Sequence, residues 1–263
     1  MAAPLVSDAL WSLFSPLLPP HPPRPKGGRP PINARATLTG ILFVLKSGIP
    51  WEMLPQEMGC GSGMTCWRRL RDWQETGIWQ AFHHTLLDRL GRAGLIDWSR
   101  CSLDAASLPA KAGGAATGPN PTDRGKPGSK RHLVVDRQGI PLAVLLTAAN
   151  VHDSTLLEEA LDAVPPVRQP RDRPKKLHTD KAYDYPRCRR ACRKRGIVPR
   201  IARRGIESSE RLGRHRWVVE RTLSWIARCR RLVVRYERRD DIHLAFLVLA
   251  CAAICFRYLQ RFC

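Results

Sequence analysis

Negatively charged residues are scarce in this 263-residue sequence, because 23 Asp and Glu stand against 44 Lys and Arg and leave a net charge of +21. The imbalance is concentrated between Pro165 and Arg239, where 25 basic residues accompany 7 acidic ones and supply +18 of that total. A basic surplus gathered on one stretch is typical of proteins that bind a polyanion. The charge predicts nucleic acid as the partner, ahead of a membrane surface.

The sequence also lacks a hydrophobic run long enough to cross a bilayer. Its longest apolar run, Leu244 to Phe256, has 13 residues, whereas a transmembrane helix needs about 20. The first twenty residues have neither the charged region nor the small-residue cleavage site of a secretory signal. We therefore expect a cytoplasmic protein without a membrane partner, in which the apolar run forms a buried helix.

Cysteines are present in an odd number, nine, and no secretory signal accompanies them, so reduced thiols are expected. Two pairs, Cys188 with Cys192 and Cys251 with Cys255, have a spacing that could suggest zinc. Neither pair has a second pair or a histidine nearby at ligand spacing. We interpret both pairs as packing residues on helices.

The N-terminal part has the periodicity of short helices. An amphipathic segment from Val6 to Leu18 is ended by two prolines, and a Pro-rich basic linker follows at about 19–31. Further helices are expected at 34–47, 51–58, 62–75 and 78–94. This pattern predicts a small all-α module over residues 1–95.

The helix expected from Ser62 is basic and carries Arg68, Arg69 and Arg71. A helix, a turn and a basic helix form the layout of a helix-turn-helix DNA reader. Helical triplets are also common in ordinary packing, so DNA reading and plain packing both remain open for this module.

From residue 96 the pattern changes to strands. A strand is expected from Trp98 to Leu108, a mobile loop over 111–129, and a hairpin around the turn Asp136-Arg137-Gln138-Gly139. Helices then alternate with strands, at 153–163, 175–179, 185–195 and 197–202, before a helix around Glu220 and a last helix from Ile242. The order predicts an α/β domain over 96–263, with a mixed sheet and helices on both faces.

Three carboxylates take distinctive places in this order. Asp104 lies on the first strand, Asp180 ends the fourth, and Glu220 lies on the helix after the fifth, among six arginines between 214 and 231. The first and fourth strands can be neighbours in such a sheet, with the late helix beside them. This is the ribonuclease-H-like layout, in which three carboxylates converge on a divalent metal ion. The alternative for Glu220 is an exposed helix with ion pairs, since Arg216 lies one turn away.

Other residues compete for these roles. Asp184 could replace Asp180, but Asp180 directly ends the strand, and we interpret Asp184 as the cap of the next helix. We interpret Asp136 as a turn residue, Asp153 as a helix cap, and His178 as a residue that packs or lines the site.

The remaining basic and aromatic residues bear on DNA contact. Five Arg and one Lys in the nine residues 187–195 are costly to crowd together unless phosphates neutralise them. Trp217 and Trp225 are interpreted as core residues, with a wedge into a distorted DNA end as the alternative for Trp217. The predicted DNA contacts are Arg68, Arg69, Arg71, Arg190, Arg193, Arg216, Arg228 and Arg231.

Three blocks carry a resemblance to a known family: Leu103-Asp104, His178-Thr179-Asp180-Lys181-Ala182-Tyr183-Asp184 and Arg216-Trp217-Val218-Val219-Glu220-Arg221-Thr222. The same resemblance extends to five further stretches: Gly118 to Gly125, Ala149 to Ser154, Arg230 to Leu232, Arg235 to Glu237 and Gly48 to Trp51. Over nearly its whole length, the chain resembles DDE-type insertion-sequence transposases of the insertion sequence 4 and 5 group.

The family's pattern of Tyr, Arg, Glu and a later Lys is only half kept. Arg216 and Glu220 are present, whereas Gly213 and Ala227 occupy the other two positions. Arg228, beside Ala227, is a candidate replacement for the Lys. This difference bears on which basic residue orients the DNA end, and it leaves the acids untouched.

The resemblance implies that Asp104, Asp180 and Glu220 ligate two Mg²⁺ ions, with Mn²⁺ able to substitute, because Mg²⁺ takes hard oxygen ligands. Two such ions, roughly 3.5–4 Å apart, activate an attacking oxygen and stabilise a leaving one. The implied activity is cleavage of double-stranded DNA at the element's ends and their joining to target DNA. Pairing two ends calls for at least a dimer, and the implied location is the bacterial cytoplasm, at the nucleoid.

Two alternatives belong to other function classes. A structure-selective, metal-dependent nuclease would need the same acids but has no use for a helical module that reads a specific end. A non-catalytic DNA-binding protein, such as a decayed copy, would tend to have lost an acid, whereas all three are present here.

Overall fold

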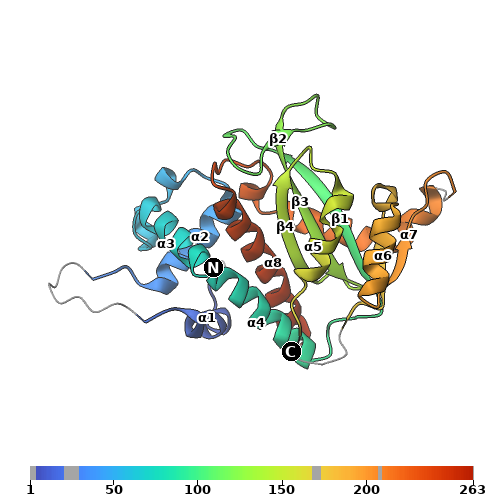
Figure 1. Cartoon of the computed structure of the whole chain (residues 1–263). Helices are drawn as coiled ribbons and strands as arrows, with labels where there is room; N and C mark the ends of the chain where they lie inside the picture. The colour runs from blue at the N-terminus through green and yellow to red at the C-terminus, as the bar shows by residue number, and fades with distance from the viewer. Residues whose placement is uncertain (1–3, 21–29, 168–172, 207–208, 263) are drawn as a thin grey trace.

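The computed structural model describes residues 4–20, 30–167, 173–206 and 209–262, with side chains from 215 onward in the last range. Most of the linker predicted at about 19–31 lies outside these residues, as does the side chain at position 213. Figure 1 shows the N-terminal helices on one side of the molecule, the sheet on the other, and helix α8 between them.

The N-terminal part is helical, as predicted. Its helices are α1 (Asp8–Phe14), α2 (Ala34–Ser47), α3 (Gly63–Glu75) and α4 (Ile78–Arg92), with 3₁₀ turns η1 (Ser15–Leu17), η2 (Trp51–Met53) and η3 (Gln56–Met58). The single helix expected over 51–58 was wrong, because Pro55 separates two short turns. The Ser62 hydroxyl caps α3 by accepting from the Thr65 N–H, as expected.

The connection from α2 to α3 is longer than the turn of a helix-turn-helix. It runs over 48–62 and includes η2 and η3, whereas that motif joins its helices by three or four residues. Gly48 ends α2 with a left-handed φ of 75°, and a side chain there would meet the Cβ of Arg230 at 2.9 Å. DNA reading by this module stays a prediction.

The second part is built on a six-stranded mixed sheet, as predicted. Its strands are β1 (Cys101–Pro109), β2 (Gly118–Pro119), β3 (Pro127–Asp136), β4 (Pro141–Ala148), β5 (Lys176–Thr179) and β6 (Val198–Ile201). β3 pairs antiparallel with β1, β2 and β4, while β1, β5 and β6 run parallel to one another. The first and fourth predicted strands are therefore neighbours in the sheet, as β1 and β5.

Helices cover both faces of this sheet. They are α5 (Leu157–Asp162), α6 (Pro186–Lys194), α7 (Ser209–Ala227) and α8 (Asp240–Phe262), with 3₁₀ turns η4 (Asp153–Leu156), η5 (Lys181–Tyr183) and η6 (Arg230–Leu232). In Figure 1, α5 and α6 lie on one side of the strands and α8 on the other. α7 contacts β1, β3, β5 and α8.

Three local expectations were wrong. The loop expected over 111–129 contains β2 and the first residues of β3. His152 caps η4 by accepting from the Ser154 N–H, whereas Asp153 pairs with Lys130 at 2.7 Å. Asp184 does not cap α6, because its carboxylate accepts from Arg189. The predicted caps were replaced by ion pairs, that of Asp153 with Lys130 of β3 and that of Asp184 with Arg189 of α6 itself.

α8 holds the two parts of the chain together. Among the described helices it alone is long and apolar enough to cross a membrane, but 78% of its most apolar window is buried inside the protein. It packs against α3, α4 and β4, and the Phe246 ring stacks on Trp51 at 5.8 Å. One hydrophobic cluster extends from Val6 through α8 to the sheet. The predicted division at residues 95/96 stays a prediction.

A fully buried arginine fixes the loop after β1. Arg235 has no exposed surface and donates to five acceptors from three segments of the chain. They are the carbonyl oxygens of Ala116, Glu237 and Arg238 and the hydroxyls of Thr117 and Ser129, at 2.8–3.2 Å. Among the described residues no carboxylate forms an ion pair with this guanidinium, so these hydrogen bonds stabilise its buried charge.

Replacing Arg235 with leucine should destabilise the protein by about 3–5 kcal/mol, because the buried acceptors lose their donor. Urea unfolding measures this change. The exposed Arg190→Leu variant serves as control and should stay within about 0.5 kcal/mol of the wild type. Equal unfolding midpoints for Arg235→Leu and the wild type would contradict this role.

His83 should make stability depend on pH. It is buried on α4, its Nε2 lies 2.9 Å from the Pro141 carbonyl oxygen, and burial lowers its pKa to about 4. Between pH 6.5 and 4 the unfolded chain binds a proton that the folded chain does not, so stability falls as the pH falls. The loss attributable to His83 is about 3 kcal/mol.

His83→Gln keeps a donor for Pro141 but does not titrate. Its free energy of unfolding should therefore fall less than that of the wild type between pH 6.5 and 4, and urea unfolding at several pH values tests this. Above pH 7 the free energies of unfolding of the two proteins should change equally with pH. If they also change equally between pH 6.5 and 4, His83 is not the group responsible.

Candidate active site

The register of two parallel strands brings two carboxylates side by side. Ser102 of β1 pairs with His178 of β5, and Asp104 and Asp180 each lie two residues further along the chain. Residues two apart on extended backbone project to the same face, and Asp180 retains an extended conformation. The charge of Asp180 is accordingly one of the causes that raise the pKa of Asp104.

Asp104 is largely buried, and a neighbouring cation stabilises its ionised carboxylate. Its side chain is 16% exposed, and its Oδ1 accepts from the Ala105 N–H at 2.8 Å. Its Oδ2 accepts from Arg216 Nη2 of α7 at 3.1 Å. Burial raises the pKa of Asp104, and Arg216 opposes this effect. The ionised form is thus supported by positive charge next to it.

Asp180 is held by the turn that follows β5. Its Oδ1 accepts from the Ala182 N–H at 3.0 Å and caps η5. The rival Asp184 accepts from the Arg204 N–H at 2.9 Å and from Arg189 at 2.6 Å, which lowers its pKa. Since both Asp184 oxygens are engaged by arginine residues, the geometry favours Asp180 as the ligand.

Glu220 lies on the other side of Arg216. Its side chain is 58% exposed, and its Oε1 is 3.7 Å from Arg216 Nη2, so one guanidinium lies between Asp104 and Glu220. Within the described parts of the chain, no three His, Cys, Asp or Glu residues lie close enough together to hold a metal ion. The structure brings Asp104 and Asp180 together and places Glu220 next to them across a cation.

The polar atoms around the acid pair fit a hydrated cation. Tyr183 is fully buried, and its hydroxyl has no hydrogen-bond partner among the described residues. Burial raises the pKa of Tyr183 well above its usual value, and Asp153, Asp104 and Asp180 raise it further. Carboxylate oxygens and an unpartnered hydroxyl form a suitable donor set for a hard divalent ion with its retained waters.

Sequence reasoning did not single out Tyr183. The signal for Tyr183 was present, because it lies three residues after Asp180 in the same block. The His178 ring packs against His215 at 5.0 Å, and burial followed by His215 and Arg100 lowers its pKa to about 4. His178 is therefore neutral near pH 7 and packs beside the acid pair.

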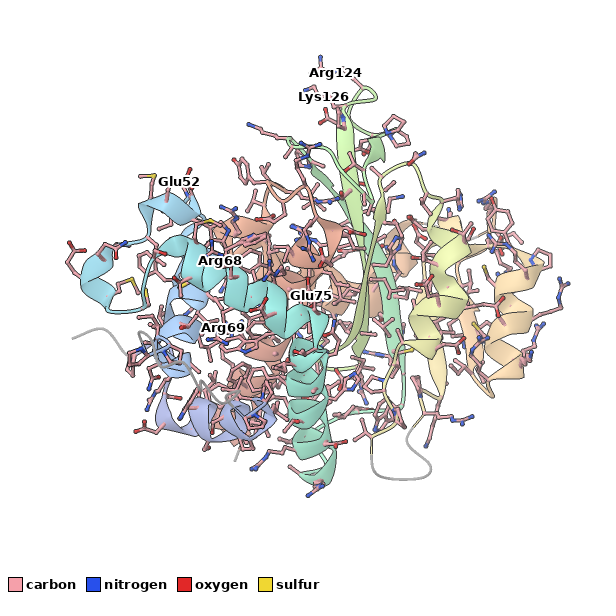
Figure 2. All side chains as sticks on the ribbon, turned by 60° about the vertical axis from the view of Figure 1, so that its left-hand side comes forward. Glu52, Arg68, Arg69, Glu75, Arg124 and Lys126 are labelled. Carbon is pink, nitrogen blue, oxygen red and sulfur yellow. The ribbon has the colours of Figure 1, made fainter. Side chains whose placement is uncertain are left out.

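The three arginines of α3 that are predicted to contact DNA differ in how far other side chains already engage them. Arg68 is exposed, Arg69 lies over the Trp73 ring, and Arg71 pairs with Asp72 at 2.7 Å. Figure 2 shows Arg68 and Arg69 along α3, with Glu75 near its end. Arg68 is the residue on this helix best placed to meet a phosphate.

Arg190 and Arg193 are exposed on α6, and Arg228 is exposed just beyond α7. Arg231 is different. It is 7% exposed, its Nε binds Glu237 Oε1 at 2.6 Å, and its Nη1 donates to the Ile49 carbonyl. Arg231 was predicted to lie on the Glu220 helix, but α7 ends at Ala227. Its guanidinium is enclosed by protein, so the prediction that Arg231 contacts DNA was wrong.

The expectation that Trp217 belongs to the core was also wrong. Its side chain is 49% exposed, and the Arg221 guanidinium lies over its ring at 4.6 Å. The buried stripe of α7 consists of Val218, Val219, Thr222, Leu223 and Ile226.

Two protein families match successive parts of the chain. Residues 6–83 match the family described as "Putative transposase of IS4/5 family", and residues 91–255 match "Transposase DDE domain". The matches cover the helical module, the whole sheet and all three acids.

Two relatives come from Burkholderia cepacia. The chain is 54% identical over 149 residues to "Putative transposase for insertion sequence element IS402", across 55% of this chain and 71% of that protein. It is also 54% identical over 123 residues to "Insertion element IS402 uncharacterized 16.2 kDa protein", across 46% of this chain and 84% of that protein.

A DDE transposase domain has the ribonuclease-H-like fold, acts on DNA, cleaves it and generally uses a divalent metal ion. The fold predicted from the sequence is therefore confirmed. On both family matches and the identity to its relatives, the chain belongs to the DDE transposases of the IS4/5 insertion-sequence family.

Proposed function

We propose that this transposase binds the ends of its insertion sequence, cuts them and joins them to target DNA, using Asp104, Asp180 and Glu220 as the catalytic acids. The observation that carries the proposal is the side-by-side placement of Asp104 and Asp180 at one level of β1 and β5. α7 supports it, because it brings Glu220 and Arg216 to the same place.

The metal in this proposal is Mg²⁺, for which Mn²⁺ can substitute, held by Asp104, Asp180 and Glu220. Metal ions bound there would activate the attacking oxygen and stabilise the leaving oxygen of an in-line displacement at phosphorus. The protein's own part is to fix the carboxylates: the Ala105 N–H orients Asp104, and the Ala182 N–H orients Asp180. Arg216 offsets their charge and is available to a phosphate oxygen.

Double-stranded DNA is the proposed partner, as element end and as target. Its phosphates would meet the exposed or partly exposed cations on α3, α6 and α7 and just after α7. These cations are Arg68, Arg69, Arg71, Arg190, Arg193, Arg216 and Arg228. We further propose that the protein works as at least a dimer, because two ends must be cut together, and that it acts in the cytoplasm at the nucleoid.

Asp104→Asn, Asp180→Asn and Glu220→Gln should each reduce cleavage and joining at least about a hundredfold, because each removes a charged oxygen from the site. The measurement uses a labelled duplex that carries the element's own end, with Mg²⁺ or Mn²⁺. DNA binding, measured in parallel, should be retained.

Asp184→Asn is the matched control, since it removes a nearby carboxylate that arginine residues engage. It should keep most of the activity. Nicking without joining by the wild type would favour the nuclease alternative, and binding without any product would favour the non-catalytic one.

Arg216→Gln should increase the amount by which Mg²⁺ stabilises the folded protein. The substitution leaves Asp104 beside Asp180 without its cation, so the metal-free variant should lose about 1–3 kcal/mol of stability. Added Mg²⁺ should then raise its unfolding temperature by more than it raises that of the wild type.

The control for Arg216→Gln is the exposed Arg200→Gln, near the same strand end. It should respond to Mg²⁺ as the wild type does. An equal rise in unfolding temperature for Arg216→Gln and the wild type would show that Arg216 does not share the site with the metal.

A further inference from the structure

The outer face of α7 carries aromatic and basic side chains that the acid site does not use. Arg221 lies over two rings, 4.6 Å from that of Trp217 and 4.5 Å from that of Trp225. Side chains four residues apart lie one above the other on a helix, so these three form a ladder along α7. The Arg221 guanidinium also donates to the Gln138 carbonyl, which fixes it to the β3–β4 hairpin.

Beyond Trp225 the ladder opens into a hollow of about 470 Å³ between α1, α2, the end of α7 and α8. Lys46 of α2, Arg228 after α7 and Arg257 of α8 line it, together with Trp225. Apolar side chains such as Leu42 form most of the rest of its wall, and among the described residues no Asp or Glu lines it. Three cations from three elements thus face one concave surface.

Among the described residues, Lys46, Arg228 and Arg257 have no carboxylate within ion-pair distance, whereas Arg189, Arg195 and Arg231 each pair with one. Burial raises the pKa of the Cys229 thiol in the same hollow, and Arg257 and Lys46 both oppose this effect, so the two cations converge on it. Converging cations without acids repel one another, and an anion relieves that repulsion.

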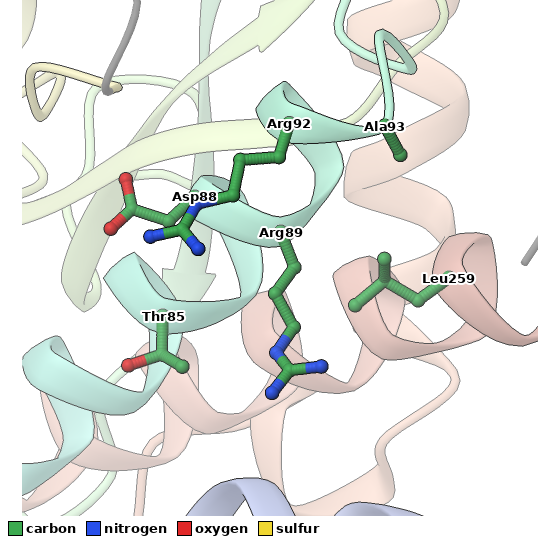
Figure 3. A pocket seen from close by; sticks show the side chains of 6 residues that line it. All are labelled: Thr85, Asp88, Arg89, Arg92, Ala93 and Leu259. Carbon is green, nitrogen blue, oxygen red and sulfur yellow. The ribbon is translucent and has the colours of Figure 1, made fainter.

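A second hollow, of about 600 Å³, provides a contrast (Figure 3). It lies between α4 and the end of α8 and is lined by Arg89 and Arg92, but also by Asp88 and by no aromatic ring. Figure 3 shows Asp88 and Arg92 extending to the same side of α4. Its cations are accompanied by the carboxylate of Asp88, so this hollow serves as a control site.

We propose that the ladder Trp217–Arg221–Trp225 and the hollow of Lys46, Arg228 and Arg257 form a binding track for an unpaired DNA strand. Tryptophan faces bind bases by stacking, whereas lysine and arginine bind phosphates, and this combination is typical of single-strand sites. A duplex presents its phosphates outside and its base faces inside, so it can use neither the rings nor a concave hollow.

The position of the track supports this assignment. Trp217 follows Arg216 and Arg221 follows Glu220 on α7, so the track begins one residue, or about 100° around the helix, from the acid site. It ends at Lys46 of the N-terminal module. The source of the strand rests on the proposed function, since cutting a DNA end at the acids would release an unpaired strand there; binding of such a strand does not depend on cutting.

The test compares a labelled single-stranded oligonucleotide with a duplex of the same sequence, by fluorescence anisotropy with the full chain in EDTA. Trp217→Ala should weaken single-strand binding by about tenfold and duplex binding by less than about twofold. Lys46→Gln combined with Arg257→Gln should lower the salt dependence of single-strand binding by about 1.4 in slope, since each phosphate contact contributes about 0.7.

Arg92→Gln at the second hollow and Tyr236→Ala, an exposed aromatic with Arg231 over its ring, are the matched controls. Both should bind either DNA as the wild type does, and unfolding temperatures establish that all variants fold. Equal losses on single strand and duplex would overturn the proposal in favour of a duplex contact, and unchanged binding would overturn it altogether.

The experiments distinguish an error in the proposed track from an error in the proposed function. Asp180→Asn should bind single strands normally, because it lies outside the track. If the wild type makes no cleaved product but Trp217→Ala still loses single-strand binding, the track survives and the proposed function fails. If cleavage and joining occur while the track variants bind single strands normally, the track fails alone.

Discussion

Two carboxylates at the same level of adjacent parallel strands repel each other, and the site is arranged around that repulsion. The β1–β5 register fixes Asp104 beside Asp180 before any other part of the site is considered. Burial of Asp104 strengthens the effect, because less solvent screens the charge. Positive charge must therefore come from elsewhere. Arg216 supplies it in this structure, and divalent metal would supply it during the proposed reaction.

Arg216 is a residue of α7, so the position of this helix determines where the positive charge lies. It is attached to the turn of the β3–β4 hairpin, where the Thr222 hydroxyl donates to the Gly139 carbonyl at 2.8 Å. A side chain at position 139 would meet that hydroxyl at 2.8 Å, so the turn needs glycine at its point of contact with the helix. The buried Asp136 accepts from three backbone N–H groups and holds the same turn. A residue predicted only to form a turn thus also positions the helix that carries Arg216 and Glu220.

The order of most elements along the chain, most helix limits and the proximity of Asp104 to Asp180 could be predicted, because they follow from local periodicity and from where strands end. The caps assigned to Asp153 and Asp184 could not, since Lys130 and Arg189 compete for them and only the fold reveals those partners. Arg231 was misplaced because helical spacing was extended past the end of α7. The exposure of Trp217 could have been predicted from its position off the apolar stripe of that helix.

The segment after α7 is attached to the N-terminal module and sets the length of the proposed track. Arg231 donates to the Ile49 carbonyl just after α2, and Glu237, paired with Arg231, also contacts His243 of α8. α7 is thereby fixed at the hairpin and at its C-terminal end. From Trp217 to Ala227, the last residue of α7, the helix advances about 15 Å. In the proposed track, an unpaired strand leaving the acids would follow α7 over that distance before its phosphates reached the cations of the hollow.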